Sequence, residues 1–345
     1  MAEIIGRIDG QDVLAVTLHG ANGLRARIIS YGARLTELWV PDRAGNLADI
    51  VLGHDSLADY EASATYFGAT CGRYANRIAR GRFPLDGREV VLNLNEGAQH
   101  LHGGAGGLDR KLWRVIETTE RDVTLAVTSP AGEMGYPGRL EVRCRYWLDD
   151  VDQLWIEMRA GTDAPTMVNL VNHAYFNMAG QGSGTVLDQH LRVEAGHYTP
   201  VDATLIPTGE VLSVAGTAFD FTASRPVGAV LNGPMGFDHN WCLSAPLAPF
   251  CGEQMRFCAE ASDPQSGRAL RLWTNEPGVQ LYIGGYLDDR LPGKAGARIG
   301  QFGGFTLETQ RFPDSPNRPQ FPSTRLEPGQ VYRHLMAFNF APLAD

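Results

Sequence analysis

The sequence predicts an all-β protein, a large antiparallel β-sandwich with few short helices. Turn-forming residues occur throughout the chain, with 40 glycines and 20 prolines among 345 residues, and they separate short segments rich in β-branched and aromatic residues. Many of these segments alternate apolar with polar residues, which is the pattern of a strand with one buried face. Because such segments follow one another with few helical stretches between them, antiparallel sheets are favoured over parallel ones.

Seven segments show the strand pattern clearly, and one stretch is helical in character. The strand segments are RARIISYG (25–32), DVTLAVTS (122–129), LEVRCRYWL (140–148), QLWIEMRAG (153–161), ALRLWTNE (269–276), VQLYIGGYL (279–287) and RHLMAFNF (333–340). The stretch SLADYEAS (56–63) predicts a short helix with Ser56 as its N-cap. No repeat, low-complexity tract or long linker divides the sequence, so we expect one β-sandwich domain over residues 1–345.

Charge and cysteine content narrow the functional classes. The formal net charge is −9 and the pI is near 5.5, which argues against nucleic-acid binding, since such proteins normally carry a basic surface, and against adhesion to anionic membranes. Five cysteines without CxxC spacing are typical of reduced thiols. The first residues lack a signal-peptide pattern, and no apolar run approaches the ~18 residues of a membrane span. We therefore expect a cytoplasmic protein.

Two predicted strands carry an ionisable residue on a polar face. In VNLVNHAYFN (168–177) the even-numbered residues are mostly apolar, and the odd-numbered face carries His173 among hydrogen-bonding side chains. In GGFTLETQRFPDSPN (303–317) one face is apolar, and the other carries Glu308 between Thr306 and a glutamine. A single residue of this kind is usually structural. Two such strands in one chain favour a shared polar cleft.

Three more stretches concentrate polar residues: GRYANRIARGRFPLDG (72–87), LNLNEGAQHLHGG (92–104) and GFDHNWCL (236–243). His100 and His102 would share a face of an extended chain, but glycines occupy the region where a carboxylate would have to complete a metal site. Asp238 and His239 are adjacent, so only one of them can point into a given cleft. Motifs for phosphate, nicotinamide or serine-nucleophile chemistry are absent. We therefore expect no cofactor and no metal.

The order of these stretches resembles that of the aldose 1-epimerase (galactose mutarotase) family. The matching elements are GRYANRIARGRFPLDG, NEGAQHLHGG, NLVNHAYFNMAG, FDHNWCL and LETQRFPDSPN. They span residues 72–317, and the strand-rich flanks fit, so the resemblance covers nearly the whole chain. It implies a β-sandwich with its site in an open cleft, and an isomerase that interconverts the α and β anomers of a free aldose such as glucose or galactose.

The resemblance also implies roles for six residues. His173 matches the group that acts on the sugar ring oxygen, Glu308 matches the group that acts on the C1 hydroxyl, and His102 matches a second active-site histidine. The positions that match substrate-binding residues are Asn76, Arg77 and Asp238. His100 matches no catalytic position and is expected to be structural.

The chemistry of anomer interconversion is consistent with these residue types. Opening the ring requires a base at the C1 hydroxyl and an acid at the ring oxygen. Histidine has a reference pKa of about 6.5, and a glutamate becomes an effective base when its surroundings raise its pKa from about 4.3. The expected partner is a monosaccharide substrate. Two alternatives remain: a non-catalytic carbohydrate-binding β-sandwich, and a glycosidase that uses Asp238 and Glu308 as its carboxylate pair.

Overall fold

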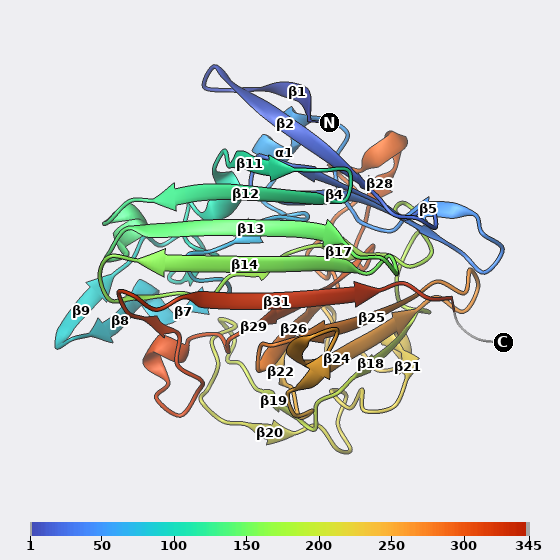
Figure 1. Cartoon of the computed structure of the whole chain (residues 1–345). Helices are drawn as coiled ribbons and strands as arrows, with labels where there is room; N and C mark the ends of the chain where they lie inside the picture. The colour runs from blue at the N-terminus through green and yellow to red at the C-terminus, as the bar shows by residue number, and fades with distance from the viewer. Residues whose placement is uncertain (1, 343–345) are drawn as a thin grey trace.

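The structure is a computed structural model that describes residues 2–342, and its strands form three large antiparallel sheets (Figure 1). The five-stranded sheet contains β1 (Glu3–Ile8), β2 (Gln11–His19), β3 (Arg25–Ile29), β4 (Arg34–Pro41) and β5 (Leu47–Asp49). The six-stranded sheet runs in spatial order through β17 (Tyr175–Phe176), β29 (Phe305–Gln310), β26 (Gly278–Tyr282), β22 (Asp238–Cys242), β19 (His197–Thr199) and β20 (Leu212–Ser213).

The ten-stranded sheet is the largest. Its spatial order is β11 (Arg114–Thr118), β12 (Asp122–Ser129), β13 (Leu140–Leu148), β14 (Leu154–Thr162), β31 (Tyr332–Asn339), β25 (Ala269–Thr274), β24 (Glu253–Ser262), β18 (His190–Val193) and β21 (Arg225–Pro226), with β23 (Ala248–Phe250) paired to β24. In β13 every second side chain is buried over most of the strand, as the alternating sequence predicted.

Short two-stranded ladders connect the large sheets. They pair β6 (Thr70–Cys71) with β16 (Val171–Asn172), β7 (Arg77–Ile78) with β10 (His100–Leu101), β8 (Arg82–Leu85) with β9 (Arg88–Val91), β15 (Thr166–Met167) with β30 (Arg325–Leu326), and β27 (Leu291–Pro292) with β28 (Arg298–Ile299). The 3₁₀ turns are η1 (Ala79–Gly81), η2 (Leu108–Arg110), η3 (Glu133–Gly135), η4 (Val227–Ala229), η5 (Lys294–Gly296) and η6 (Ser315–Asn317).

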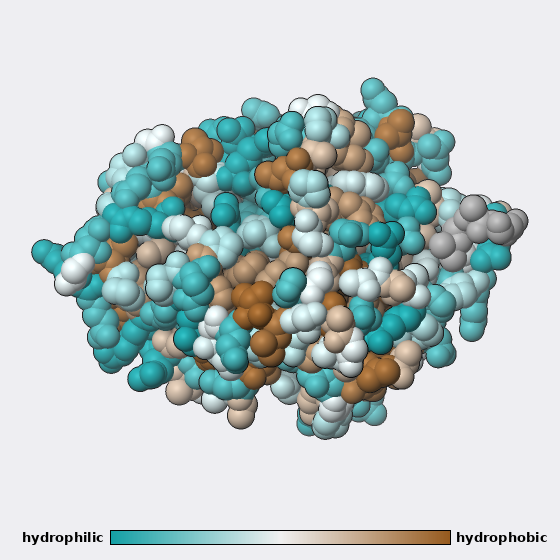
Figure 2. All heavy atoms as spheres, turned by 90° about the horizontal axis from the view of Figure 1, so that it is seen from below, coloured by the Kyte–Doolittle hydropathy of each residue, from teal (hydrophilic) through white to brown (hydrophobic). Residues whose placement is uncertain are grey.

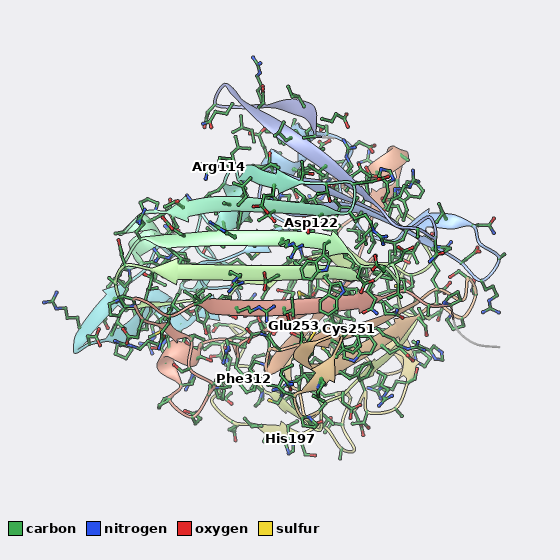
Figure 3. All side chains as sticks on the ribbon, in the orientation of Figure 1. Arg114, Asp122, His197, Cys251, Glu253 and Phe312 are labelled. Carbon is green, nitrogen blue, oxygen red and sulfur yellow. The ribbon has the colours of Figure 1, made fainter. Side chains whose placement is uncertain are left out.

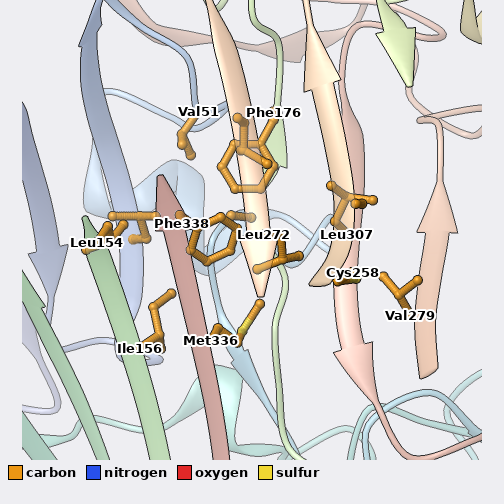
Figure 4. Packing of buried hydrophobic residues seen from close by; sticks show 14 of the residues in the cluster. Val51, Leu154, Ile156, Phe176, Cys258, Leu272, Val279, Leu307, Met336 and Phe338 are labelled. Carbon is orange, nitrogen blue, oxygen red and sulfur yellow. The ribbon is translucent and has the colours of Figure 1, made fainter. Parts of the chain in front are cut away.

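The main hydrophobic core lies between the ten-stranded and six-stranded sheets. Leu272, Met336 and Phe338 from the large sheet pack in one cluster with Phe176 and Leu307 from the smaller sheet (Figure 4). Each such side chain contributes roughly 1.5–3 kcal/mol when it leaves water. This packing of one sheet on another confirms the predicted β-sandwich.

The local predictions hold with one exception. All seven strand segments contain a strand, and α1 (Leu57–Ala62) begins after Ser56, whose hydroxyl accepts from the Asp59 backbone N–H. The prediction of one strand over 168–177 is wrong. The segment divides into β16, which pairs with β6, and β17, which pairs with β29, because it changes partners as it passes from a small ladder into the six-stranded sheet.

The face of the molecule seen in Figure 2 is mainly polar. Figure 2 shows a largely hydrophilic face with hydrophobic residues in small separate groups, as is common on proteins that fold around an internal core. Within residues 2–342, no helix has the length and apolar character needed to cross a membrane.

Candidate active site

A cleft of about 370 Å³ collects all six residues singled out from the sequence. They are Asn76, Arg77, His102, His173, Asp238 and Glu308. The floor of the cleft is the polar face of the six-stranded sheet, where Glu308 on β29 is directly opposite Gln280 on β26. Asn76, Arg77 and His102, which lie in or beside the small β7–β10 ladder, also line the cleft. Segments more than 200 residues apart in the sequence therefore meet in one concave site.

His173 and Glu308 form a buried ionisable pair in the cleft. The Nε2 atom of His173 lies 3.4 Å from Oε1 of Glu308, and both side chains are at most 5% exposed. Thr306 donates a hydrogen bond of 2.9 Å to the same carboxylate oxygen. The second oxygen of Glu308 and Nδ1 of His173 are buried without a hydrogen-bond partner. The pair thus retains polar atoms that a ligand can satisfy.

Burial shifts the two pKa values in opposite directions. Loss of solvation raises the pKa of Glu308 to about 8 and lowers the pKa of His173 to about 4. At neutral pH the contact is therefore between a neutral carboxyl group and a neutral imidazole, and the pair holds one titratable proton in total. A pair of this kind titrates as a unit.

His102 is held in a defined tautomer by the backbone. Its Nδ1 atom accepts from the backbone N–H of Asn76 at 3.2 Å, and burial lowers its pKa well below the ordinary value. The proton of the neutral ring therefore lies on Nε2, which makes this atom a hydrogen-bond donor. The ring lies edge-on to His173, with 5.0 Å between centroids.

The backbone around His102 is unusually constrained. His102 and Asn76 both adopt positive φ, at 51° and 62°, which is costly for residues other than glycine. At Gly103 an added Cβ would lie 1.8 Å from the carbonyl oxygen of Gly72. Glycine at this position therefore permits the close approach of two backbone segments that sets His102 in place.

Arg77 lies between two carboxylates. Its Nε and one Nη donate to the two oxygens of Glu96, each at 2.6 Å, and its other Nη lies 3.5 Å from Oδ2 of Asp238. Gln280 donates to the remaining oxygen of Asp238 at 2.6 Å. The carboxylates raise the pKa of Arg77 despite its burial, so the guanidinium keeps its charge.

Aromatic rings complete the walls. Tyr66, Tyr175, Tyr282 and Tyr286 line the cleft. The ring centroids of Tyr175 and Tyr66 lie 5.1 and 5.6 Å from that of His173. These rings lower the local polarity around the imidazole and present flat apolar surfaces beside donors and acceptors. This combination of polar groups and flat walls suits a small polyhydroxylated ligand.

The ring nitrogens and carboxylate could also coordinate a metal ion. Ligand atoms of His102, His173 and Glu308 lie within 4.8 Å of one another, and two histidines with a carboxylate can bind several transition metals. The proton chemistry described below uses these same atoms. His100 lies outside this group: its nitrogens contact the Asn93 carbonyl and the Tyr136 hydroxyl, both at 2.6 Å.

Sequence reasoning missed Glu96 and Gln280 as parts of the cleft. Glu96 stands inside the quoted NEGAQHLHGG stretch, and Gln280 stands in a segment correctly predicted as a strand. Arg77, the partner of Glu96, precedes it by the whole β8–β9 hairpin, and Asp238, the partner of Gln280, lies on a different strand, β22. The only available signal for Gln280 was its position as a polar residue among apolar neighbours.

Comparisons with known proteins agree on one family. The family model described as aldose 1-epimerase matches residues 15–339. The chain is 46% identical over 322 residues to galactose mutarotase of Bos taurus, covering 92% of this chain and 91% of that protein. It is 33% identical over 340 residues to aldose 1-epimerase of Escherichia coli (strain K12), covering 96% of each. A crystal structure of an aldose epimerase homologue from C. elegans superposes with a TM-score of 0.89 at 30% identity, covering 96% of this chain and 99% of that one.

Proposed function

The chain belongs to the aldose 1-epimerase family and is an isomerase of the mutarotase type, and from this premise we propose how its cleft carries out the reaction. The substrate is a free aldose, with galactose and glucose as the first candidates, since the Bos taurus relative is named for galactose. The sugar binds with its C1 hydroxyl at Glu308 and its ring oxygen at His173.

The observation that carries this proposal is the 3.4 Å contact between His173 and Glu308. The C1 hydroxyl and the ring oxygen are bonded to the same carbon, so the groups that serve them must be close neighbours. A buried acid and base at this separation can each reach one of the two oxygens. Each contributes roughly 10²–10⁴ in rate when well placed.

Ring opening then follows from one proton moving in each direction. The Glu308 carboxylate takes the proton from the C1 hydroxyl while the protonated His173 gives its proton to the ring oxygen. The C1–O5 bond breaks and a C1 aldehyde forms. After rotation about the C1–C2 bond, His173 takes its proton back, Glu308 returns the other, and the ring closes as the opposite anomer.

Because one proton can lie on either Glu308 or His173, the pair can supply both a base and an acid. Burial favours the form with the proton on Glu308, and the reactive form has the same proton on His173. The two forms carry the same number of protons, so their ratio does not depend on pH. The negative charge of Asp238 partly offsets the lowering of the His173 pKa by burial and also raises the pKa of Glu308, so it favours retention of the shared proton by the pair.

The remaining residues bind and orient the sugar. Nε2–H of His102 donates to the region of the ring oxygen. Arg77 donates to a hydroxyl, and Asp238 accepts from one, so a single hydroxyl can bridge the 3.5 Å between them. The backbone N–H of Asn76 donates to Nδ1 of His102 and so fixes the orientation of that ring, and Asn76 also lines the cleft.

The glycosidase alternative is less well supported. Of the two carboxyl groups, Glu308 keeps a proton for a leaving group, and both oxygens of Asp238 already face protein donors, one from Gln280 and one from Arg77. The carboxylate is therefore engaged as an acceptor. The alternative also leaves His173 and His102 without a role.

Polarimetry on freshly dissolved α-D-galactose and α-D-glucose tests the proposal. The protein is expected to accelerate the approach to anomeric equilibrium well beyond the buffer rate without releasing reducing ends from a glycan panel. Calorimetric binding of the sugar without acceleration would instead establish the non-catalytic carbohydrate-binding alternative.

A further inference from the structure

The Arg77–Glu96 pair has a geometry with consequences for substrate charge. A guanidinium binds carboxylates and phosphates best through a paired edge of two N–H donors. In this cleft, the edge formed by Nε and one Nη of Arg77 is filled by the two oxygens of Glu96 at 2.6 Å each. One of the two paired edges of Arg77 is therefore occupied by the protein itself, and the Nη atom that completes the other edge lies 3.5 Å from Oδ2 of Asp238.

Glu96 is fixed in this position by its own turn. Its backbone pairs with Gln99 through two hydrogen bonds, Glu96 N–H to Gln99 O at 3.2 Å and Gln99 N–H to Glu96 O at 2.9 Å. The Gln99 side chain accepts from the backbone N–H of Arg80 and donates to the Thr204 hydroxyl. The turn is thus anchored on two sides, and Glu96 does not depend on Arg77 alone for its placement.

The charge balance of the cleft is negative. Among the described residues that line it, Arg77 is the only lysine or arginine, and the carboxylates are Glu96, Asp238, Asp288 and Glu308. Asp288 is paired with the exposed Arg290 at 2.5 Å, and burial keeps Glu308 protonated. Two carboxylates, Glu96 and Asp238, therefore face one guanidinium.

We propose that Glu96 is a specificity-determining residue that selects aldoses by charge. By filling one paired edge of Arg77 and leaving an excess negative charge, it admits neutral aldoses and aldoses with an ammonium group, and it rejects aldoses with a carboxylate or phosphate group. This inference rests on the proposed function and adds the substrate class to it.

The same contact gives Glu96 a second effect on neutral sugars. With its Nε edge held, Arg77 keeps its remaining Nη toward Asp238, where a sugar hydroxyl can bridge the two groups. In Glu96→Gln, one N–H of Arg77 would face the amide N–H of the glutamine where it now meets a carboxylate oxygen. Glu96 is thus a positioning residue for Arg77 as well as a source of charge.

The test compares three sugars of nearly the same shape. Anomer exchange of D-glucose, D-glucuronate and D-glucosamine is measured by NMR exchange spectroscopy, at a pH where the amine is protonated, to give kcat/KM for each. In Glu96→Gln, the ratio of glucuronate to glucose is expected to rise about tenfold or more over wild type, and the ratio of glucosamine to glucose is expected to fall. Because Glu96 is partly exposed, both changes should shrink in high salt.

A matched control is available on the neighbouring strands. Glu89 forms a 2.5 Å pair with Arg82 on β8 and β9, outside the cleft, with both side chains more than half exposed. Glu89→Gln makes the same change in charge and is expected to leave both ratios within about twofold of wild type. Glu96→Asp retains the charge and is expected to keep the ratios while lowering the rate on glucose.

The outcomes separate the two claims. If Glu96→Gln lowers kcat/KM for all three sugars by one common factor, Glu96 acts only through the position of Arg77 and charge selection is wrong. If wild type accelerates no aldose at all, the proposed function fails instead. A rise in the glucuronate ratio with a folded variant, as judged by circular dichroism, supports the inference.

Discussion

Two glutamates on strands of the two packed sheets behave in opposite ways. Glu253 lies on β24 of the ten-stranded sheet, labelled in Figure 3, and accepts from Arg333 through both oxygens at 2.7 Å. That hydrogen bonding lowers its pKa. Glu308 lies on β29 of the six-stranded sheet without a cation bonded to it, and burial raises its pKa to about 8.

The difference lies in what covers each sheet. On the outer face of the ten-stranded sheet, the side chains of Arg333 and Glu253 are 35% and 36% exposed and neutralise each other; an exposed pair of this kind contributes roughly 0–1 kcal/mol. The corresponding face of the six-stranded sheet is covered by the segments that line the cleft, so Glu308 on that face of β29 is as buried as the core-facing Phe305 and Leu307. An ionisable residue on such a face is suited to proton transfer when it is buried and no opposite charge is bonded to it, because its pKa is then strongly shifted.

The largest expected effect comes from removing the enclosed carboxyl group. Glu308→Gln is expected to lower kcat for anomer exchange by roughly 10²–10⁴, because the variant retains the shape of the side chain without the base. Glu253→Gln, its counterpart on the open sheet, is expected to leave the rate unchanged. Polarimetry on both purified variants checks this, and a Glu308→Gln variant with a near-normal rate would remove Glu308 from the mechanism.

Two buried histidines allow a parallel comparison. Burial lowers the pKa of both His173 and His334 to about 4, but His334 uses both nitrogens in the core, contacting the Leu170 carbonyl and the Thr309 hydroxyl at 2.8 and 2.7 Å. His173→Asn is expected to lose roughly 10²–10⁴ in rate and remain folded.

His334→Asn is expected to lose roughly 1–3 kcal/mol of stability, because it leaves buried groups unpaired, while it retains its rate per folded molecule. Denaturant unfolding and polarimetry on both variants separate the two roles. Equal loss of rate in both would show that the core, and not the cleft, limits activity.

The dependence of activity on pH reflects the shared proton. The Glu308–His173 pair loses its base when both groups are protonated, below about pH 4, and loses its acid when both are deprotonated, above about pH 8. We expect kcat/KM to be nearly flat between these values and to fall about tenfold per pH unit outside them. A single step near pH 6.5, typical of an unperturbed histidine, would contradict this account.

Stability should respond to pH with opposite signs at the two glutamates. The folded pKa of Glu308 is above its ordinary value of 4.5, so the folded state holds an extra proton between about pH 4.5 and 8, and stability falls as pH rises through that range. The folded pKa of Glu253 is lowered, so its contribution is present above about pH 4.5 and is lost as pH falls further.

Urea unfolding across this range, with Glu308→Gln and Glu253→Gln beside wild type, measures both slopes. Relative to wild type, Glu308→Gln should become more stable as pH rises from about 4.5 to 8. Glu253→Gln should be less stable than wild type above about pH 4.5, and this difference should disappear as pH falls further. The same slope in all three proteins would mean that neither glutamate contributes to the pH dependence.

Much of the architecture could be predicted from local sequence. The alternation in 140–148 gave a strand with the same bounds, and Ser56 was correctly predicted as the N-cap of α1. The parity around Glu308 was also correct, because Phe305 and Leu307 pack in the core while Glu308 faces the cleft. These features depend on the period of a strand and the chemistry of a cap, which only a few neighbouring residues determine.

The division of 168–177 into β16 and β17 could not be predicted in this way. Both halves are extended and both are buried, so the sequence pattern is the same as that of one continuous strand. The change of partner from β6 to β29 depends on where those distant segments lie. The contact of Glu96 with Arg77 was likewise missed, because the β8–β9 hairpin separates the two residues in the sequence and no periodicity links them.

The sequence by itself determined which side chains share a face and, through the order of its motifs, which family the chain resembles. The tertiary structure decided what those faces do, because a pKa depends on solvent exclusion and on charges that arrive from other segments. Glu308 and Glu253 are the same amino acid in the same kind of element. Enclosure by remote loops makes one a candidate base, and exposure beside Arg333 makes the other a surface ion pair.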